Sequence, residues 1–504
     1  PIETTWSHDK IVRKRNSFLS PSLRTFQAYS KPLVLKRGEG QYLWDVGDKR
    51  YVDLMAQNLC ISVGYNHPLV NREAKKQIDL MAHCTTMYFQ SAPACFAEEL
   101  VARFPTGGDW VAHFVNSGSE AIDLALKDAG LTKEALNAIF FSNTFWGMFD
   151  NQHSIRGEVV MRHMGVGNIP VTNVENACAG GSTALYLAYT GIRAGMYDVA
   201  MAVGSEKITN PNKMLSLSAY GTCMDVGNFE KHIQNLMEIS KTFTVKIPAD
   251  QSAPGEGRSI FMDAYAMGAR WHMSRFNSTQ QQLAVICAKN HFHGSLNPLS
   301  QYQQVMTADE VLADKMVAYP LTRAMCAPVG DGSAATIICS EKFLKKLTAA
   351  RPVHIRASVL GTGSDRDLNA PDIGERLAKQ AYNMAGVGPE DINLAELHDA
   401  TSWGELHQTE SMGFCPMGEG GPFAESGATT LGGKKPINTS GGLECKGHPI
   451  GASGLSQIHE LVVQLRGEAG KRQVEGARIG LAENGGGNIG VEEAAMCIHI
   501  LEKM

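Results

Sequence analysis

The chain has 504 residues, and at roughly 100 to 200 residues per domain this length predicts about three or four domains. Its formal charge of -5 at pH 7 gives no basic face for nucleic acid, and no apolar run reaches the ~18 residues of a membrane span, so we expect neither partner. The eleven cysteines are scattered and odd in number, which predicts reduced thiols and a cytoplasmic location.

The first part of the chain combines short strands with a helical stretch. Residues 41–54 predict a hairpin, because the strong turn pair Gly-Asp lies at their centre. A helix-rich stretch follows at 68–104, and WVAHFV at 110–115 is typical of a strand. The sequence NSGSE at 116–120 then opens a helix that runs through Leu126. Amides and hydroxyls converge at such a helix start and can hold an anion.

Residues 35–126 resemble the N-terminal part of class III aminotransferases, through GEGQYLWDVGDKRYVDL, GYNHP and VNSGSEA. The resemblance implies that Ser117, Gly118 and Ser119 would help hold the phosphate of pyridoxal phosphate. A transaminase also needs a Schiff-base lysine and a carboxylate on the pyridine nitrogen, and nothing after Lys127 resembles their surroundings. We therefore expect the serine-rich turn to be a helix cap, and we expect no pyridoxal phosphate.

A repeat divides the remaining chain. AGLTKEALNAIFFSN at 129–143 matches AGVGPEDINLAELHD at 385–399, and each copy predicts a helix end, a turn and an apolar strand. A repeat at this spacing indicates two similar α/β halves. Cys178 follows the first copy, whereas Cys445 and the Gly-His-Pro sequence of His448 follow the second. We expect the two halves to bring a cysteine and histidines to a shared seam.

Cys178 lies within VTNVENACAGGSTALYL at 171–187. The β-branched residues before it favour a strand, and the apolar residues after it recur at helical spacing. A cysteine at a strand-to-helix turn meets free N–H groups and the positive end of the helix dipole, which lower a thiol pKa. The alternative interpretation is a small buried hydrophobic residue, which is a common use of cysteine.

From about Lys127 to the end, the chain resembles the thiolase superfamily, in particular its sterol-carrier-protein-type branch. ENACAGGSTA, KNHFHGSLNP, PLTRAMCAPVGDGSAA, LHDATS, NTSGGLECKGHPIGASG and ENGGGNIG occur in family order. The resemblance implies an α/β thiolase fold: two similar βαβαβαββ halves in a five-layered αβαβα arrangement with an inserted loop domain, after an N-terminal α+β aminotransferase-like segment. The implied domains are 1–126, 127–345 with the insertion at about 211–321, and 346–504.

The resemblance also implies an acyltransferase that uses acyl-CoA and CoA, in thiolytic cleavage of a 3-oxoacyl-CoA or the reverse condensation. It makes Cys178 the nucleophile and His448 the group that removes its proton. His398 would position a water or donate to the thioester oxygen of the second substrate, and the backbone N–H groups of Cys178 and Gly485–Gly487 would form another oxyanion hole. It implies no tightly bound cofactor, a homodimer and a small accessory subunit, in lipid or aromatic acid degradation.

The chain departs from the family at the second acid–base group. Common thiolases have a cysteine where this chain has Glu483, and the sterol-carrier branch often has one where this chain has Ala400. Cys445 is the first substitute and Glu483 the second. Three alternatives stay open: an acyltransferase that makes no carbon–carbon bond, an impaired fusion that acts as a binding or assembly subunit, and, more remotely, a pyridoxal phosphate-binding protein.

Three further patterns concern a metal site, the missing strand and the substrate. Cys445-x-x-His448 and His291-x-His293 could be metal pairs, but no further pair completes a site, so we expect no metal. WVAHFV at 110–115 would replace the missing first thiolase strand, which we expect beside the strand at 138–141. The predicted insertion has methionines and aromatic residues that could line an acyl pocket or simply pack: Met237, Met262, Tyr265, Met267, Trp271 and Met273.

Overall fold

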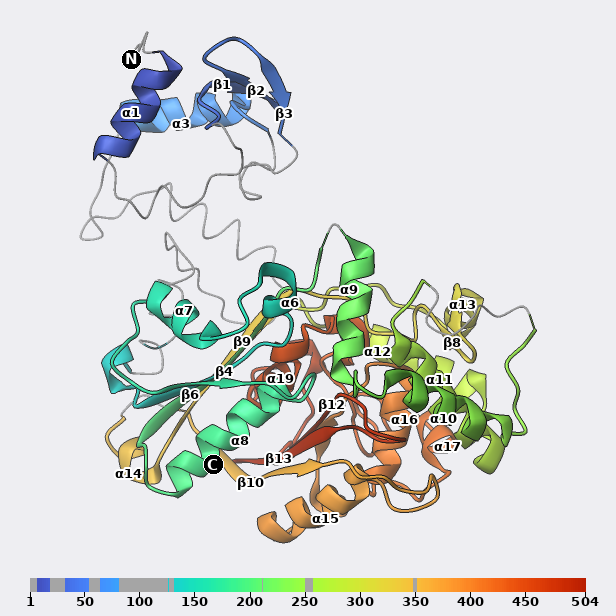
Figure 1. The fold of residues 1–504 in the computed structure, drawn as a ribbon. Coiled ribbons are helices and arrows are strands. Elements are labelled where there is room, and N and C mark those ends of the chain that lie inside the picture. The colour runs from blue at the N-terminus through green and yellow to red at the C-terminus, as the bar shows by residue number, and fades with distance from the viewer. Residues whose placement is uncertain are drawn as a thin grey trace. The chain divides into compact units, whose positions relative to one another are not determined.

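The structure is a computed structural model that describes residues 7–18, 32–53, 64–80, 126, 131–210, 212–249, 257–347 and 351–504. The chain divides into two compact units, Pro1–Glu99 and Leu100–Met504, which are described separately (Figure 1). The predicted strand at 110–115 and the turn that holds Ser117, Gly118 and Ser119 lie outside the described residues.

The first unit contains a three-stranded antiparallel sheet in the order β1-β2-β3. The predicted hairpin is confirmed, because β2 pairs with β3 across a turn where Asp48 has φ 67° and the Asp45 carboxylate accepts the Gly47 N–H at 2.8 Å. The helix predicted from residue 68 is described as far as Leu80, and the rest of that prediction lies outside the described residues. The elements are α1 (His8–Phe18), β1 (Leu35–Glu39), β2 (Tyr42–Asp45), β3 (Arg50–Val52) and α3 (Pro68–Leu80).

The second unit has two four-stranded sheets with related topology, in the orders β5-β4-β6-β9 and β11-β12-β13-β10. In each sheet a parallel pair, β4 with β6 or β11 with β12, is followed by an antiparallel partner, β9 or β13. The strands are β4 (Ala138–Ser142), β5 (Val171–Val174), β6 (Val199–Glu206), β9 (Gly332–Cys339), β10 (Val353–Thr362), β11 (Leu394–Glu396), β12 (Ile479–Gly486) and β13 (Ala495–Lys503).

The sequence repeat becomes a structural repeat at the start of β4 and β11. A 3₁₀ turn precedes each strand, at 133–135 and 389–391. Asn137 Oδ1 accepts the N–H groups of residues 198 and 199 at 2.9 Å, and Asn393 Oδ1 accepts those of residues 478 and 479 at the same distance. The same side chain therefore ties the same pair of parallel strands in each half.

Helices α8 (Gly180–Arg193) and α19 (Ser453–Arg466) form the middle layer between the sheets (Figure 1). Leu185 of α8 and Leu455 of α19 belong to one buried cluster with residues of both sheets. Helices α7 (Arg156–His163) and α14 (Glu341–Leu344) pack on the outer face of the first sheet, and α15 (Ile373–Ala385) packs on the outer face of the second. The predicted αβαβα layering is confirmed.

The expected place of the missing first strand is wrong. β4 already pairs with β5 on one side and β6 on the other, so no strand can pair beside residues 138–141. In the second half the first strand, β10, pairs outside β13 rather than centrally. Because β9 corresponds to β13, an equivalent strand in the first half would pair with β9.

The insertion between β6 and β9 is mainly helical, as Figure 1 shows. None of the helices in the described ranges is long and apolar enough to cross a membrane. The loop between β10 and α15 agrees with the turn-rich sequence there. The insertion contains α9 (Lys213–Tyr220), α10 (Phe229–Lys241), α11 (Ile260–Phe276), α12 (Gln280–Ser295), α13 (Ala308–Ala313), β7 (Met316–Ala318) and β8 (Leu321–Thr322), and other short helices are α6 (Trp146–Asp150), α16 (Ser402–Ser411), α17 (Gly420–Glu425) and α18 (Gly442–Lys446).

Candidate active site

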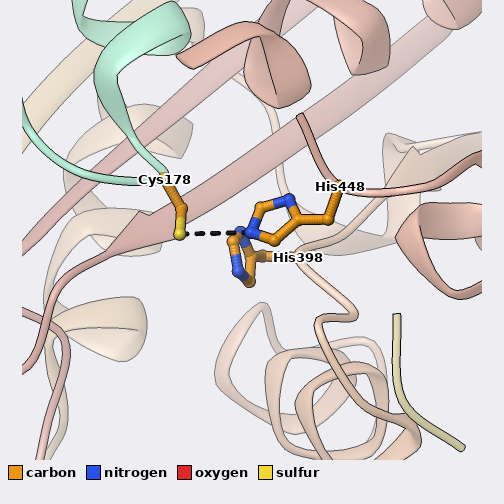
Figure 2. Close-up of side chains that lie close together, drawn as sticks. All are labelled: Cys178, His398 and His448. Carbon is orange, nitrogen blue, oxygen red and sulfur yellow. Dashed lines mark hydrogen bonds between the residues drawn. The ribbon is translucent and has the colours of Figure 1, made fainter. Parts of the chain in front are cut away.

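Cys178 lies at the turn between β5 and α8, as predicted. The preceding residue, Ala177, has φ 47°, a left-handed conformation that costs a non-glycine residue about 1–3 kcal/mol. Gly180 has no room for a side chain, since a Cβ there would lie 2.4 Å from Ser142 Oγ. The bent turn and the missing side chain bring the start of α8 against the end of β4 and direct the sulfur towards the second half (Figure 2).

The glycine-rich end of β12 packs against the backbone of the cysteine. A Cβ on Gly486 would lie 2.9 Å from Cys178 N and 2.4 Å from Ala179 N. Only a residue without a side chain permits this approach. The structure therefore brings the predicted Gly485–Gly487 segment and the Cys178 amide together.

His448 lies between α18 and α19, and its Nε2 is 3.1 Å from Cys178 Sγ (Figure 2). Its Nδ1 is 2.7 Å from Ser453 Oγ, and that hydroxyl donates its own hydrogen to the Pro449 carbonyl at 3.1 Å. Ser453 must then accept from Nδ1–H, which leaves the Nε2 lone pair for the thiol. Burial lowers the pKa of His448 to about 4, so the ring is neutral near pH 7.

His398 follows β11 and lies edge-on to the ring of His448, with centroids 5.3 Å apart. Asn484 Oδ1 accepts from Ser182 Oγ at 3.2 Å, so the amide N–H₂ of Asn484 faces His398 Nδ1 at 2.8 Å and donates to it. The proton of His398 is then on Nε2. Burial, reinforced by His448, lowers the pKa of His398 well below its ordinary value, so this ring is a neutral donor.

The structure brings all three predicted site residues together. One potential ligand atom from each of Cys178, His398 and His448 lies within 4.8 Å of the others (Figure 2). Burial raises the pKa of the Cys178 thiol well above its usual range, and negative charge at Cys223 and Glu175 adds to this. The lowered thiol pKa expected from the helix dipole is therefore wrong, because burial outweighs the dipole. Thiol and imidazole are both neutral at rest.

The two predicted second acid–base groups lie outside this cluster. Cys445 is fully buried, and a Cβ on Gly294 of α12 would lie 3.2 Å from its Sγ. Glu483 is also fully buried, and its Oε2 accepts the backbone N–H of His398 at 2.9 Å. Glu483 therefore holds the backbone of a site residue.

Sequence reasoning missed the two residues that fix the histidine tautomers. Ser453 is five positions after His448, and Asn484 directly follows Glu483. Both are short polar side chains inside glycine-rich motifs, a signal that identifies hydrogen-bonding positions but not their partners.

A buried polar network supports both histidine-bearing loops. Asp399, next to His398, accepts the Leu443 N–H at 2.6 Å and the Asn290 side-chain N–H at 3.2 Å. Leu443 belongs to α18, the helix that leads to His448. Burial of this carboxyl raises its pKa well above the ordinary value. The network ties the end of β11 to the loop of the second histidine.

His291 and His293, whose spacing could also suit a metal pair, contact backbone groups. His293 Nδ1 donates to the Asn438 carbonyl at 3.1 Å, and Nε2 accepts the Leu431 N–H at 2.9 Å. His291 Nδ1 donates to the Gln304 carbonyl at 2.9 Å. Both nitrogens of His293 are therefore engaged with backbone groups.

Comparisons with known proteins connect this geometry to a family. The sequence model described as "Thiolase, N-terminal domain" matches residues 112–342, and "Thiolase C-terminal domain-like" matches residues 363–502. An acetyl-CoA acetyltransferase of Methanothermobacter thermautotrophicus is 35% identical over 408 residues, covering 80% of this chain and 98% of that protein. The chain belongs to the thiolase family. The predicted assignment to thiolase-type acyltransferases is thereby confirmed.

Other relatives and solved structures agree with the thiolase assignment. The benzoylsuccinyl-CoA thiolase subunit BbsB of Thauera aromatica is 35% identical over 64% of this chain and 77% of its own length, and sterol carrier protein 2 of Bos taurus is 35% identical over 76% and 68%. The structure titled "Ltp2-ChsH2(DUF35) aldolase" has a TM-score of 0.60 at 22% identity, covering 77% of this chain and 94% of that one. Human mitochondrial 3-ketoacyl-CoA thiolase has a TM-score of 0.54 at 16% identity, covering 77% and 92%. These likenesses confirm the thiolase fold.

The sequence model "Aminotransferase class-III" matches residues 25–177, which confirms the second resemblance. Pyridoxal phosphate would need an available lysine. Lys289 and Lys435 are the two lysines that the described chain buries. Lys289 Nζ contacts Glu405 and the Ile437 carbonyl, and Lys435 Nζ contacts the Pro389 carbonyl at 2.8 Å. Both buried lysines are therefore engaged with protein groups, and the predicted phosphate-binding residues Ser117, Gly118 and Ser119 lie outside the described residues.

Proposed function

We propose that this thiolase-family chain transfers an acyl group from a CoA thioester through a thioester on Cys178. The observation that carries the proposal is the 3.1 Å contact between Cys178 Sγ and His448 Nε2, in a ring whose other nitrogen is held by Ser453. A cysteine with an adjacent, oriented histidine is a general arrangement for nucleophilic catalysis. Because both groups are neutral at rest, the proton moves as the sulfur attacks.

In the acylation step, Sγ bonds to the thioester carbon while its proton passes to His448 Nε2. The carbonyl oxygen becomes an oxyanion, and we place it at the backbone N–H groups of Cys178 and the adjoining glycine segment. The C–S bond to CoA then breaks, and the CoA sulfur takes the proton from His448. One such N–H donor contributes about 2.7 to 4 kcal/mol to transition-state stabilisation in a well-studied protease.

In the second half-reaction, we propose that His398 Nε2–H donates to the thioester oxygen of the other substrate. The Asn484 contact at 2.8 Å supports this role, because it fixes the proton on the nitrogen that faces away from Asn484. The reaction is thiolytic cleavage of a 3-oxoacyl-CoA or the reverse condensation, a choice supported by the names of the acetyltransferase and benzoylsuccinyl-CoA thiolase relatives.

Other expectations belong to the same proposal. We propose domains at 1–126, 127–345 and 346–504, a homodimer and a cytoplasmic location. The relative from Thauera aromatica is named as a subunit, which supports an accessory protein for this chain as well. Fatty acyl and aromatic acyl groups are the two substrate classes to compare.

Intact-protein mass spectrometry after incubation with acetyl-CoA, longer acyl-CoAs and benzoyl-CoA tests the nucleophile. We expect a mass gain of one acyl group that is lost in Cys178→Ala. Cys223→Ala is the matched control, because Cys223 belongs to the same apolar cluster and burial raises its pKa to about 12. Two results would contradict the proposal and favour an impaired fusion. One is an adduct that is lost in Cys223→Ala but kept in Cys178→Ala, and the other is no adduct on folded protein with any acyl-CoA.

A further inference from the structure

The proposed reaction leaves one chemical role without a residue. Making or breaking the carbon–carbon bond requires a group that moves a proton at the α-carbon of the second substrate. Cys178 and His448 contact each other, and His398 serves as a donor. Cys445 and Glu483 are fully buried at other contacts. The inference below therefore rests on the proposed function and supplies its missing group.

A cavity of about 80 Å³ opens beside His398. Five elements build its wall with the histidine: helices α10 and α11 of the insertion, helix α16, the loop between β10 and α15, and the loop after β12. Among the described residues that line it, Glu492 and Glu493 have carboxyl groups, whereas Cys445 and Glu483 are not part of the wall. The Glu492 carboxylate is held by two arginines, which leaves Glu493 as the candidate. The residues that matter here are Tyr265, His398, Trp403, His407, Gly487 and Glu493.

The Glu493 side chain packs against the glycine segment of the site. A Cβ on Gly485 would lie 2.8 Å from Glu493 Cγ and 3.5 Å from its carboxyl carbon. The next residue, Gly486, packs against the Cys178 amide. Glu493 and the nucleophile thus lie on two sides of one glycine pair.

A charged clamp fixes the loop that carries Glu493. The neighbouring carboxylate of Glu492 accepts from Arg366 Nε at 2.8 Å, Arg376 Nη2 at 2.9 Å and the Ile373 N–H at 2.9 Å. These partners come from the loop before α15 and from α15 itself. The clamp holds the backbone, while the Glu493 carboxyl accepts a long hydrogen bond from Gln408 Nε2 at 3.4 Å, its one side-chain hydrogen bond within the described part of the chain.

The surroundings of Glu493 favour a carboxyl group that can hold a proton. Burial raises its pKa, and the negative charges of Asp372 and Glu492 add to the rise, while the cation of His407 opposes it. His407 is itself held protonated by Asp372, with its pKa raised to about 9. The other titratable or charged groups around the cavity are Glu483 of β12, Tyr265 of α11 and Arg366 of the clamp.

We propose that Glu493 is the catalytic acid–base group at the α-carbon of the second substrate. In cleavage, Cys178 sulfur attacks the 3-oxo carbon and its proton goes to His448. The bond between the α-carbon and the 3-oxo carbon breaks, and the leaving enolate takes a proton from the Glu493 carboxyl. The proton on His448 returns to the Glu493 carboxylate by exchange with water. The incoming CoA thiol then gives its proton to His448 and attacks the acyl thioester, and Cys178 leaves and takes that proton. Condensation is the reverse.

The test separates this role from acylation. Wild type, Glu493→Gln, Glu493→Asp and Glu483→Gln are compared for adduct formation on Cys178 and for deuterium uptake at the α-carbon of acetyl-CoA in D₂O. For Glu493→Gln we expect acylation to proceed while deuterium uptake and carbon–carbon cleavage fall about 10²–10⁴-fold, the range for losing an acid–base group. Glu493→Asp should recover part of the uptake. Glu483→Gln keeps an oxygen for the His398 N–H, so its uptake should fall far less.

Each result decides a different claim. Loss of uptake in Glu493→Gln with adduct formation retained supports the inference. Unchanged uptake in Glu493→Gln overturns it, as does a selective loss in Glu483→Gln or an absence of uptake in acylated wild type. No adduct in any variant, wild type included, contradicts the proposed function itself.

Discussion

The two halves of the thiolase unit share a scaffold but carry different chemistry. At corresponding positions of the sequence repeat, near the ends of β4 and β11, the first half has Ser142 and the second has His398. Ser142 is buried beneath Gly180, where it supports the start of the nucleophile's helix. His398 instead points into a cavity. One position therefore packs a backbone in one half and presents a hydrogen-bond donor in the other.

The comparison also separates nucleophile from acid–base groups. The first half supplies Cys178, and the second half supplies both histidines together with Ser453 and Asn484. A thiol and its base from different halves meet only when the two sheets pack on the shared α8–α19 layer. Neither half alone can activate the cysteine.

The largest expected effect on catalysis comes from replacing each of the two corresponding residues by alanine. His398→Ala should slow deuterium uptake at the α-carbon about 10²–10³-fold, the usual loss for one oxyanion donor. Ser142→Ala should change it by less than about twofold, because Ser142 Oγ has no hydrogen-bond partner among the described residues. Equal losses of deuterium uptake in both variants would show that the two residues have the same role and would contradict the comparison. Far-ultraviolet circular dichroism of both variants controls for folding.

The next largest expected effect is that low pH destabilises the second half more than the first. Burial lowers the pKa of His499, in the second sheet, to about 4. Since its native pKa lies below that of the unfolded chain, protons bind the unfolded state first, so this stability is full above about pH 6.5 and is lost as pH falls towards 4. At about 1.4 kcal/mol per pKa unit, one such histidine contributes about 3 kcal/mol.

We therefore expect the protection factors, which correct for the slower intrinsic amide exchange in acid, to fall first in the strands of the second sheet at pH 4.5. His499→Gln should reduce the difference between pH 7 and pH 4.5, whereas the exposed His153→Gln in the first half should not. Faster exchange in the first sheet at pH 4.5 would reverse the comparison.

The smallest expected effect tests whether the matched asparagine side chains contribute equally to the stability of the two halves. Asn137→Ala and Asn393→Ala each remove an acceptor of two backbone N–H groups and should each destabilise their own half by about 1 kcal/mol. Urea titration read by hydrogen exchange resolves the halves. A loss in only one half would mean that the matched hydrogen bonds are not equivalent.

Much of the fold and of the candidate site could be predicted from the amino-acid sequence. Local patterns were enough for the hairpin of the first unit, the turn at Cys178 and the paired halves, because turn chemistry, residue periodicity and repetition act over short distances. The motif order was enough for the thiolase family and for the three residues that the structure brings together.

Other properties depend on burial and on contacts between segments that are distant in the sequence, so they follow only from the tertiary structure. Burial, rather than the helix dipole, sets the pKa of Cys178, and the exposed edge of a sheet decides where a strand can pair, as β4 shows. The tautomers of both histidines depend on Ser453 and Asn484, whose partners no local pattern reveals. Glu493 becomes a candidate for the same reason: hydrophobic packing closes a cavity around residues that lie far apart in the chain.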